Sequence, residues 1–495
     1  MRSARSHRAV AAVTAAGLLA LAGPVWPAAA EPPTASNPAG PESGSGGKPQ
    51  PQGRPPEGDP LRGIPPLQPK AGPPANEKPK PDLKYTKKKN CVQTLDASAR
   101  KVERKPWGQI ALNFEDAWRF TKGAGVRVAV IDTGVNRHPR LGNRVEAGGD
   151  YVVEKEDGLT DCEGHGTAVA GIIAADDKDP SVGFAGVAPE ATIVTYRQAD
   201  PSYEGEENGA KRNAGNVETM ARAIVHAVDS AKVKVINISE SACEPPGPGA
   251  YYPRLHAAVR YAIEHDVVVV AAAGNTNENK GCKQNEPYGQ INSLPSPAWF
   301  DDEVLTVGAV QEDGSAANFS VAGPWVDVAG PGTEITTLDP ARNGTGLANK
   351  LANERNELTS IQGTSFAAPY VAGVVALVRA RYPHLNAKQV IHRIEKTSQH
   401  PAGQGGWNPM IGWGMVDPVA AVTAVLPEEQ GVAAPPVGKA RLELPPYQEK
   451  NWTPMIVALG GAGGGVALLG ITLFVVNTMA RVRARQQPPT PPARS

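Results

Sequence analysis

The chain has no excess charge of either sign, because 50 aspartates and glutamates match its 50 lysines and arginines. No basic stripe with interleaved aromatic residues crosses its central part, so nothing supports nucleic-acid binding. An internal repeat is also lacking. With 495 residues, 40% of them apolar, the chain has enough material for one large core.

Two segments almost completely lack one kind of residue. Residues 31–83 are rich in Pro, Gly, Lys and Gln but have almost no apolar side chains. They cannot bury enough surface to offset chain entropy, so we expect them to be disordered or extended. Residues 455–479 contain no charged side chain. At about 1.5 Å per residue this run exceeds the roughly 30 Å hydrocarbon core of a bilayer, which predicts one transmembrane helix.

The two ends of the chain carry targeting signals. Arg2, Arg5 and Arg8 precede an apolar run at 9–22 and three alanines that end at Ala30. This pattern predicts a secretory signal peptide cleaved after Ala30. Beyond the transmembrane run, the tail has four arginines and no acidic residue, so we expect it in the cytoplasm and the main domain outside.

Cysteine is scarce, and its spacing excludes the usual zinc motifs. No CxxC pair or neighbouring pair of histidines is present, so a zinc site has no support. In an exported chain four cysteines predict two disulfides, with three connectivities open. We favour Cys91 with Cys162 and Cys243 with Cys282, because the latter two each follow a strand that borders a predicted cleft.

Hydrophobic patterning in the central part predicts the fold class. Helical patterns at 217–230, 254–265 and 387–396 alternate with apolar strand patterns at 233–238, 267–270 and 304–310. This alternation is typical of an α/β fold with a mostly parallel sheet and helices on both faces. Functional groups of such sheets gather at the carboxyl ends of the strands.

Three segments end or begin with residues suited to acyl transfer. Asp132 ends an apolar strand, His165 begins a small apolar helix, and Ser365 stands where a glycine-containing loop turns into a long apolar helix. Alone, each has a structural interpretation: a turn aspartate, a packed histidine or a helix-capping serine. Together they supply a nucleophile, its base and a carboxylate that orients the base. Asn275, which follows another apolar strand, is the candidate donor to the oxyanion.

Four motifs around these residues resemble those of the subtilisin-like serine proteases (subtilases, peptidase family S8). They are VAVIDTGV around Asp132, GHGTAVAGI around His165, AAAGN ending at Asn275, and GTSFAAP around Ser365. The resemblance extends over about residues 107–425. It implies the subtilisin-like fold, with Ser365 as nucleophile, His165 as general base, and Asp132 as its orienter. Asn275 and the Ser365 backbone N–H would then bind the oxyanion.

The flanking features resemble one group within that family, the mycosins, membrane-anchored subtilases associated with type VII secretion systems. These features are the signal sequence, the Pro-rich extension, a cysteine just before the GHGT motif, and the single C-terminal transmembrane run with a basic tail. Many secreted subtilases have a folded inhibitory prodomain where this chain has its Pro-rich segment. That departure puts prodomain-controlled activation in doubt, and a wrapping or tethering role fits better.

The strand before the substrate cleft also departs from the family pattern, roughly Asn-Xaa-Ser-Leu-Gly, whose last positions contact the substrate backbone and its P1 side. Here Ser239 is followed by Glu240 and Ser241. This substitution predicts a narrower or more polar cleft, which also includes Gly274, and a restricted specificity. The alternative, that Glu240 merely faces solvent, stays equally open.

Polar insertions at 200–216 and 338–359 are interpreted as surfaces for a secretion partner, with simple flexible loops as the alternative. Asp176, Asp177 and Asp179 match no recognised calcium loop, so we interpret them as a solvated turn. We expect no metal and no cofactor.

The expected organisation has six parts: signal peptide 1–30, extension 31–90, peptidase domain 91–426, linker 427–454, transmembrane helix 455–479 and cytoplasmic tail 480–495. The resulting hypothesis is a single-pass membrane protein with an extracytoplasmic serine endopeptidase domain. It would process secreted polypeptides and associate with type VII secretion components. Two alternatives remain: a structural stabiliser of the secretion complex and a general degradative protease.

Overall fold

The computed structural model describes residues 71–93, 104–179, 181–276, 282–286, 290–352, 357–402, 406–430 and 452–485. The predicted signal peptide and most of the Pro-rich extension lie outside these residues. So do most of the linker and the end of the basic tail.

A seven-stranded sheet forms the centre of the domain, in the order β12-β11-β9-β7-β2-β4-β3, and each neighbouring pair is parallel. Its strands are β2 (Arg127–Asp132), β3 (Val145–Asp150), β4 (Thr192–Arg197), β7 (Val235–Ile238), β9 (Val268–Ala272), β11 (Leu305–Val310) and β12 (Val328–Pro331). The strands predicted from the sequence begin or end within two residues of the observed ones. The predicted α/β class is therefore confirmed.

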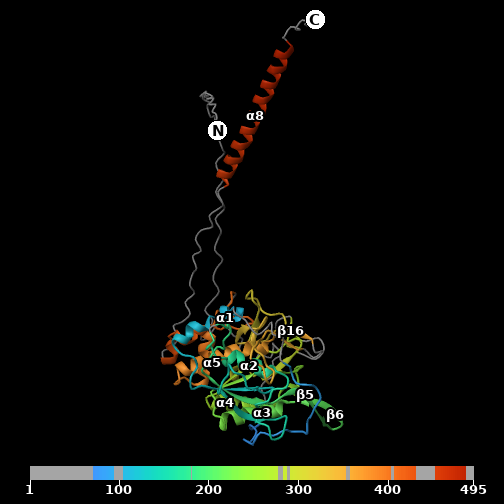
Figure 1. Ribbon diagram of the computed structural model, residues 1–495. Coiled ribbons are helices and arrows are strands. Elements are labelled where there is room, and N and C mark those ends of the chain that lie inside the picture. Colours follow the sequence, from blue (N-terminus) through green and yellow to red (C-terminus); the bar gives the residue numbers. More distant parts are fainter. Residues whose placement is uncertain are drawn as a thin grey trace, which may run out of the picture.

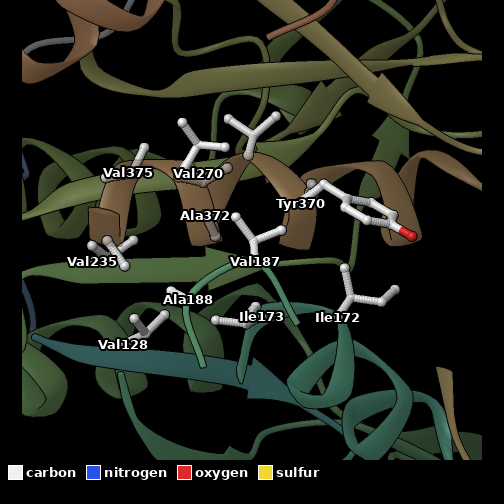
Figure 2. Close-up of a cluster of buried hydrophobic side chains, with 14 of the residues drawn as sticks. Val128, Ile172, Ile173, Val187, Ala188, Val235, Val270, Tyr370, Ala372 and Val375 are labelled. Carbon is white, nitrogen blue, oxygen red and sulfur yellow. The ribbon is translucent and has the colours of Figure 1, made fainter. Parts of the chain in front are cut away.

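Helices cover both faces of this sheet because its strands are apolar on both sides (Figure 1). The helices involved are α2 (His165–Ala174), α5 (Thr364–Arg381), α3 (Val217–Asp229), α4 (Pro253–Glu264) and α6 (Ala387–Thr397). Successive side chains of a strand point to opposite faces. Along β2, Val128 and Val130 pack in the cluster with α2 and α5, whereas Ala129 and Ile131 pack in the cluster with α3 and α4. Figure 2 shows the first cluster, in which the strand residues Val128, Val235 and Val270 lie among side chains of α2 and α5.

Shorter elements connect and border this core. The helical ones are α1 (Trp107–Leu112), η3 (Phe114–Arg119), η4 (Pro248–Ala250), η5 (Asp301–Glu303), α7 (Pro418–Thr423) and η7 (Pro427–Gln430). The short strands are β1 (Thr86–Lys87), β5 (Asp200–Glu207), β6 (Ala210–Ala214), β8 (Ala242–Glu244), β10 (Leu294–Ser296), β13 (Thr337–Leu338), β14 (Leu347–Ala348), β15 (Lys350–Ala352) and β16 (Leu358–Ser360).

The two insertions are ordered hairpins where the structure describes them. Residues 200–214 form the antiparallel pair β5–β6, and the second insertion contains the pairs β13–β14 and β15–β16. The first hairpin is extended by β1 of the N-terminal extension, which pairs with β5. In the same extension Asp82 binds Arg212, at 2.5 Å, and Asn216, at 2.6 Å. The described part of the extension, from residue 71, is therefore held against the domain in an extended form.

The C-terminal helix α8 (Thr453–Arg485) has 33 residues. It begins two residues before the predicted transmembrane run and continues beyond it. Its apolar side chains are exposed, and the helix is long and apolar enough to cross a bilayer. It is the one candidate membrane span among the described helices.

Candidate active site

The fold brings the candidate triad residues to the carboxyl edge of the sheet. Asp132 is the last residue of β2, and His165 is the first residue of α2. Ser365 is the second residue of α5, and the residue before this helix is Gly363. Ser365 is therefore not the helix cap, which was its structural alternative.

The Asp132 carboxylate holds the imidazole of His165. Its Oδ1 lies 2.8 Å from Nδ1 of His165 and also accepts the backbone N–H of Thr133 at 2.8 Å. Asp132 is fully buried, and its Oδ2 has no hydrogen-bond partner among the described residues. The imidazole packs against Phe366, with 4.9 Å between ring centroids, which places it beside the residue that follows Ser365.

Asn275 and Ser365 converge on Gly363. A Cβ built on this glycine would lie 3.0 Å from Ser365 Oγ and 3.4 Å from Asn275 Nδ2, and its φ of 147° favours glycine. The Asn275 Oδ1 accepts both the backbone N–H of Thr364, at 2.9 Å, and its hydroxyl, at 3.0 Å. Because its oxygen is bound to Thr364, the amide nitrogen of Asn275 is the end of this side chain that lies near Gly363.

Ser239 is hydrogen-bonded to the backbone of the candidate nucleophile. Its hydroxyl donates to the Ser365 carbonyl at 2.7 Å and accepts from Asn237 Nδ2 at 2.9 Å. Ser239 is buried and is absent from the lining of the adjoining cavity, whereas Glu240 and Ser241 line it. Gly274 lies against the sulfur of Cys282. The four predicted cleft residues thus have different roles in the structure.

Asp161 is a buried residue that the sequence reasoning missed. Its Oδ1 accepts from the Thr133 hydroxyl and the Gly164 N–H, at 2.9 and 2.7 Å. Its Oδ2 accepts from the N–H and the hydroxyl of Thr167, at 2.8 and 2.6 Å. Burial raises the pKa of Asp161 to about 7. The residue joins the turn after Asp132 to the start of the helix that carries His165. In the sequence, only its position four residues before His165 indicates this role.

A cavity of about 330 Å³ lies beside His165. It is lined by Thr133, Glu163, His165, Gln198, Ala199, Pro201, residues 213–217, Met220 and residues 240–242. Burial, together with the charge of Asp132, raises the pKa of Glu240 to about 7. Glu240 is half-buried and lines this cavity, which favours a role in the cleft over simple exposure to solvent.

Carboxylates control the protonation of the candidate base. Burial alone would lower the pKa of His165, but the charge and hydrogen bond of Asp132 outweigh it. The charges of Glu163 and Glu240 add to this effect and raise the pKa of His165 to about 10. These carboxylates favour the charged imidazole, whereas an active base requires the neutral form.

Side chains able to bind a metal gather at one place among the described residues. Ligand-type atoms of Asp132, His165 and Glu240 lie within 4.8 Å of one another. Asp132 and His165 are already engaged with each other, so the group is explained by the dyad and a neighbouring carboxylate. At the predicted solvated turn, Asp177 pairs with Lys122 at 2.7 Å, but Asp176 is buried, which corrects that interpretation for Asp176.

Two disulfides border the site. Cys91 is joined to Cys162 and Cys243 to Cys282, with Cα–Cα distances of 4.3 and 5.1 Å. These are the pairings favoured from the sequence. The first attaches the N-terminal extension three residues before His165, where the Val92 N–H also donates to the Cys162 carbonyl at 2.8 Å.

Comparison with known proteins agrees with this geometry. The profile of the subtilase family matches residues 123–414. Mycosin-4 of Mycobacterium tuberculosis (strain ATCC 25618 / H37Rv) is 39% identical over 419 residues, which cover 83% of this chain and 90% of the relative. Mycosin-3 of the same strain is 40% identical over 400 residues, covering 77% and 84% of the two chains.

Solved structures show the same similarity. The MycP3 protease from the type VII (ESX-3) secretion system is 42% identical and matches with a TM-score of 0.67, covering 73% of this chain and all of that one. A chain in the intact ESX-5 inner membrane complex is 37% identical, with a TM-score of 0.67, and covers 83% of this chain and all of its own length.

Proposed function

This chain belongs to the subtilase family of serine proteases, and on that premise we propose that Ser365, His165 and Asp132 hydrolyse peptide bonds of secreted polypeptides. The observation that carries the proposal is the meeting of three elements at one sheet edge. Asp132 holds His165 at 2.8 Å, and Ser365 and Asn275 converge on Gly363.

The geometry supports a two-step acyl transfer. Ser365 Oγ attacks the scissile carbonyl carbon and passes its proton to Nε2 of His165, while Asp132 keeps Nδ1–H in place and stabilises the imidazolium. The Asn275 amide and the Ser365 backbone N–H bind the oxyanion. His165 then returns its proton to the leaving amine. Water repeats the sequence on the acyl-enzyme and releases Ser365.

Labelling with a fluorophosphonate probe tests the nucleophile. The probe reacts with an activated serine, so Ser365→Ala should lose all labelling while Ser315→Ala, a matched change at an exposed serine, keeps it. Labelling of the Ser365→Ala protein at the wild-type rate would refute the assignment.

The proposed site of action is the outer side of a membrane. Support comes from α8, the candidate span, and from the arginines that follow the apolar run. A protease added to intact spheroplasts should digest the catalytic domain and leave the C-terminal tail protected. Protection of the whole chain would contradict this orientation.

We further propose association with a type VII secretion complex, because a 37% identical chain is part of the ESX-5 inner membrane complex structure. The same observation favours a second candidate function, a structural stabiliser of that complex. A deletion strain complemented with the Ser365→Ala protein separates the two. Lost secretion would show that proteolysis is required, whereas restored secretion would favour the stabilising role.

A further inference from the structure

We propose that Glu240, assisted by Glu163, forms an acidic subsite that selects a lysine or arginine side chain at P2, P3 or P4 of the substrate, beyond P1 on the acyl side of the scissile bond. This inference rests on the proposed function and adds a specificity determinant to it.

The position of the cavity indicates which part of a substrate reaches it. The cavity is lined by His165 and by residues 240–242, but neither Ser365 nor Asn275 contributes to it. A P1 residue lies over the nucleophile and the oxyanion donors, so this space receives a neighbouring side chain. Ser239, which precedes Glu240, is held in place because its hydroxyl donates to the Ser365 carbonyl.

The charges at the cavity favour a cation. Glu240 has no hydrogen-bond or ion-pair partner among the described residues, and its neighbours include the carboxylates of Asp132 and Glu163. One oxygen of Glu163 accepts the His165 N–H at 2.8 Å, and Lys89 acts on Glu163 from the extension. His165 is the one positive group that acts on Glu240 in this part of the structure. An additional positive charge would offset the repulsion among the three carboxylates.

The apolar lining residues suit the stem of a long basic side chain. They are Pro201 and Ala214 of the β5–β6 hairpin, together with Val217 and Met220 of α3. Lysine and arginine bury their methylene groups against apolar surface while the charged end reaches a polar partner. A neutral substrate would cover the Glu240 carboxylate without pairing it, and an acidic one would add repulsion. The arrangement therefore both selects basic and excludes acidic side chains.

Peptide profiling with the full-length protein in detergent tests this subsite. Internally quenched peptides would differ at P2, P3 or P4 only, with lysine, arginine, glutamine, norleucine or glutamate. At one of these positions lysine or arginine should exceed glutamine about tenfold in kcat/KM, equivalent to about 1.4 kcal/mol. Glutamate should be the poorest substrate.

A variant of matched size separates the effect of the Glu240 charge from the effect of its shape. Glu240→Gln should bring the lysine-to-glutamine ratio to within about twofold, because it keeps the size and removes the charge. Glu264→Gln serves as control. This exposed glutamate ends α4 and precedes β9, so it lies at the amino ends of the strands, whereas the site lies at their carboxyl ends. The control variant should keep the full ratio.

The outcomes distinguish the two proposals. Peptide cleavage without preference for basic residues, or an unchanged ratio in Glu240→Gln, would overturn the subsite and leave the protease function intact. Absence of both peptide cleavage and fluorophosphonate labelling would instead refute the protease function. If Glu240→Gln loses turnover, peptide aldehydes that carry lysine or glutamine are used to block fluorophosphonate labelling instead. The lysine-to-glutamine ratio of blocking is then measured for both proteins. Equal blocking by the two aldehydes in the wild type would again overturn the subsite.

Discussion

Replacing Glu240 by glutamine should make the base of this protease available at lower pH. The carboxylate stabilises the charged imidazole of His165 and so raises its pKa, together with Asp132 and Glu163. The neutral imidazole is the active base, so the wild-type kcat/KM should rise with pH along a limb above the ordinary histidine value of about 6.5. Loss of one negative charge lowers the pKa and moves this limb to lower pH.

The distance sets the magnitude. Ligand-type atoms of Glu240 and His165 lie within 4.8 Å, which corresponds to about 3.5 kcal/mol at an effective dielectric constant of 20 and about 0.9 kcal/mol in water. These energies equal roughly 0.6 to 2.5 pKa units. Because Glu240 is partly exposed, we expect a value toward the lower end, about 1 pH unit. Glu240 is ionised above its pKa of about 7, so its charge acts on His165 over the upper part of this limb.

The assay is the pH dependence of kcat/KM between about pH 5 and 10, which reports groups of the free enzyme. The peptide should carry no charged residue near the scissile bond, so that the proposed subsite and the substrate do not contribute to the titration. Glu264→Gln, with an exposed glutamate at the far edge of the sheet, is the control and should keep the wild-type limb.

The expected result has a distinctive sign. On a neutral peptide Glu240→Gln should be faster than the wild type near pH 7, although it lacks a residue of the cleft. An acid limb that stays in place, or that moves to higher pH, would refute the electrostatic reasoning. A uniform loss at every pH would show that Glu240 acts on the shape of the cleft alone.

Three further predictions concern the surroundings of the site. Asn275→Ala should lower kcat about 10² to 10³-fold, the range known for the corresponding asparagine of a subtilisin; Thr364→Val, which removes one of its two orienting bonds, should cost about tenfold or less in the same steady-state assay. Asp161→Asn should lower stability in chemical unfolding by about 2 to 4 kcal/mol, because an amide nitrogen cannot accept two of the four bonds that the carboxylate accepts. An unchanged free energy of unfolding in Asp161→Asn would contradict this role. Replacing Cys91 and Cys162 together by serine should cost up to about 4 kcal/mol for a loop of 71 residues, seen as a lower Tm without reductant; an unchanged Tm would show that this disulfide does not stabilise the fold.

Local patterns identify the elements of the site because the functional side chains stand at the ends of regular structure. The apolar strand before Asp132 and the apolar helices after His165 and Ser365 follow from periodicity, and the observed bounds differ by only a few residues. The predicted insertions were harder to interpret. Their polar composition is equally consistent with loops and with hairpins, and the pairing of β5 with β1 depends on a segment more than a hundred residues away.

The sequence by itself determined the parallel α/β fold, the order of Asp132, His165 and Ser365, and the long apolar helix near the C-terminus. Each of these is encoded in residues adjacent along the chain. Only the tertiary structure decided that Ser239 binds the Ser365 carbonyl, that Asp161 joins β2 to α2, and that Glu240 faces a cavity beside His165. These contacts join elements distant in sequence, and side-chain direction at such meetings depends on packing rather than on local periodicity.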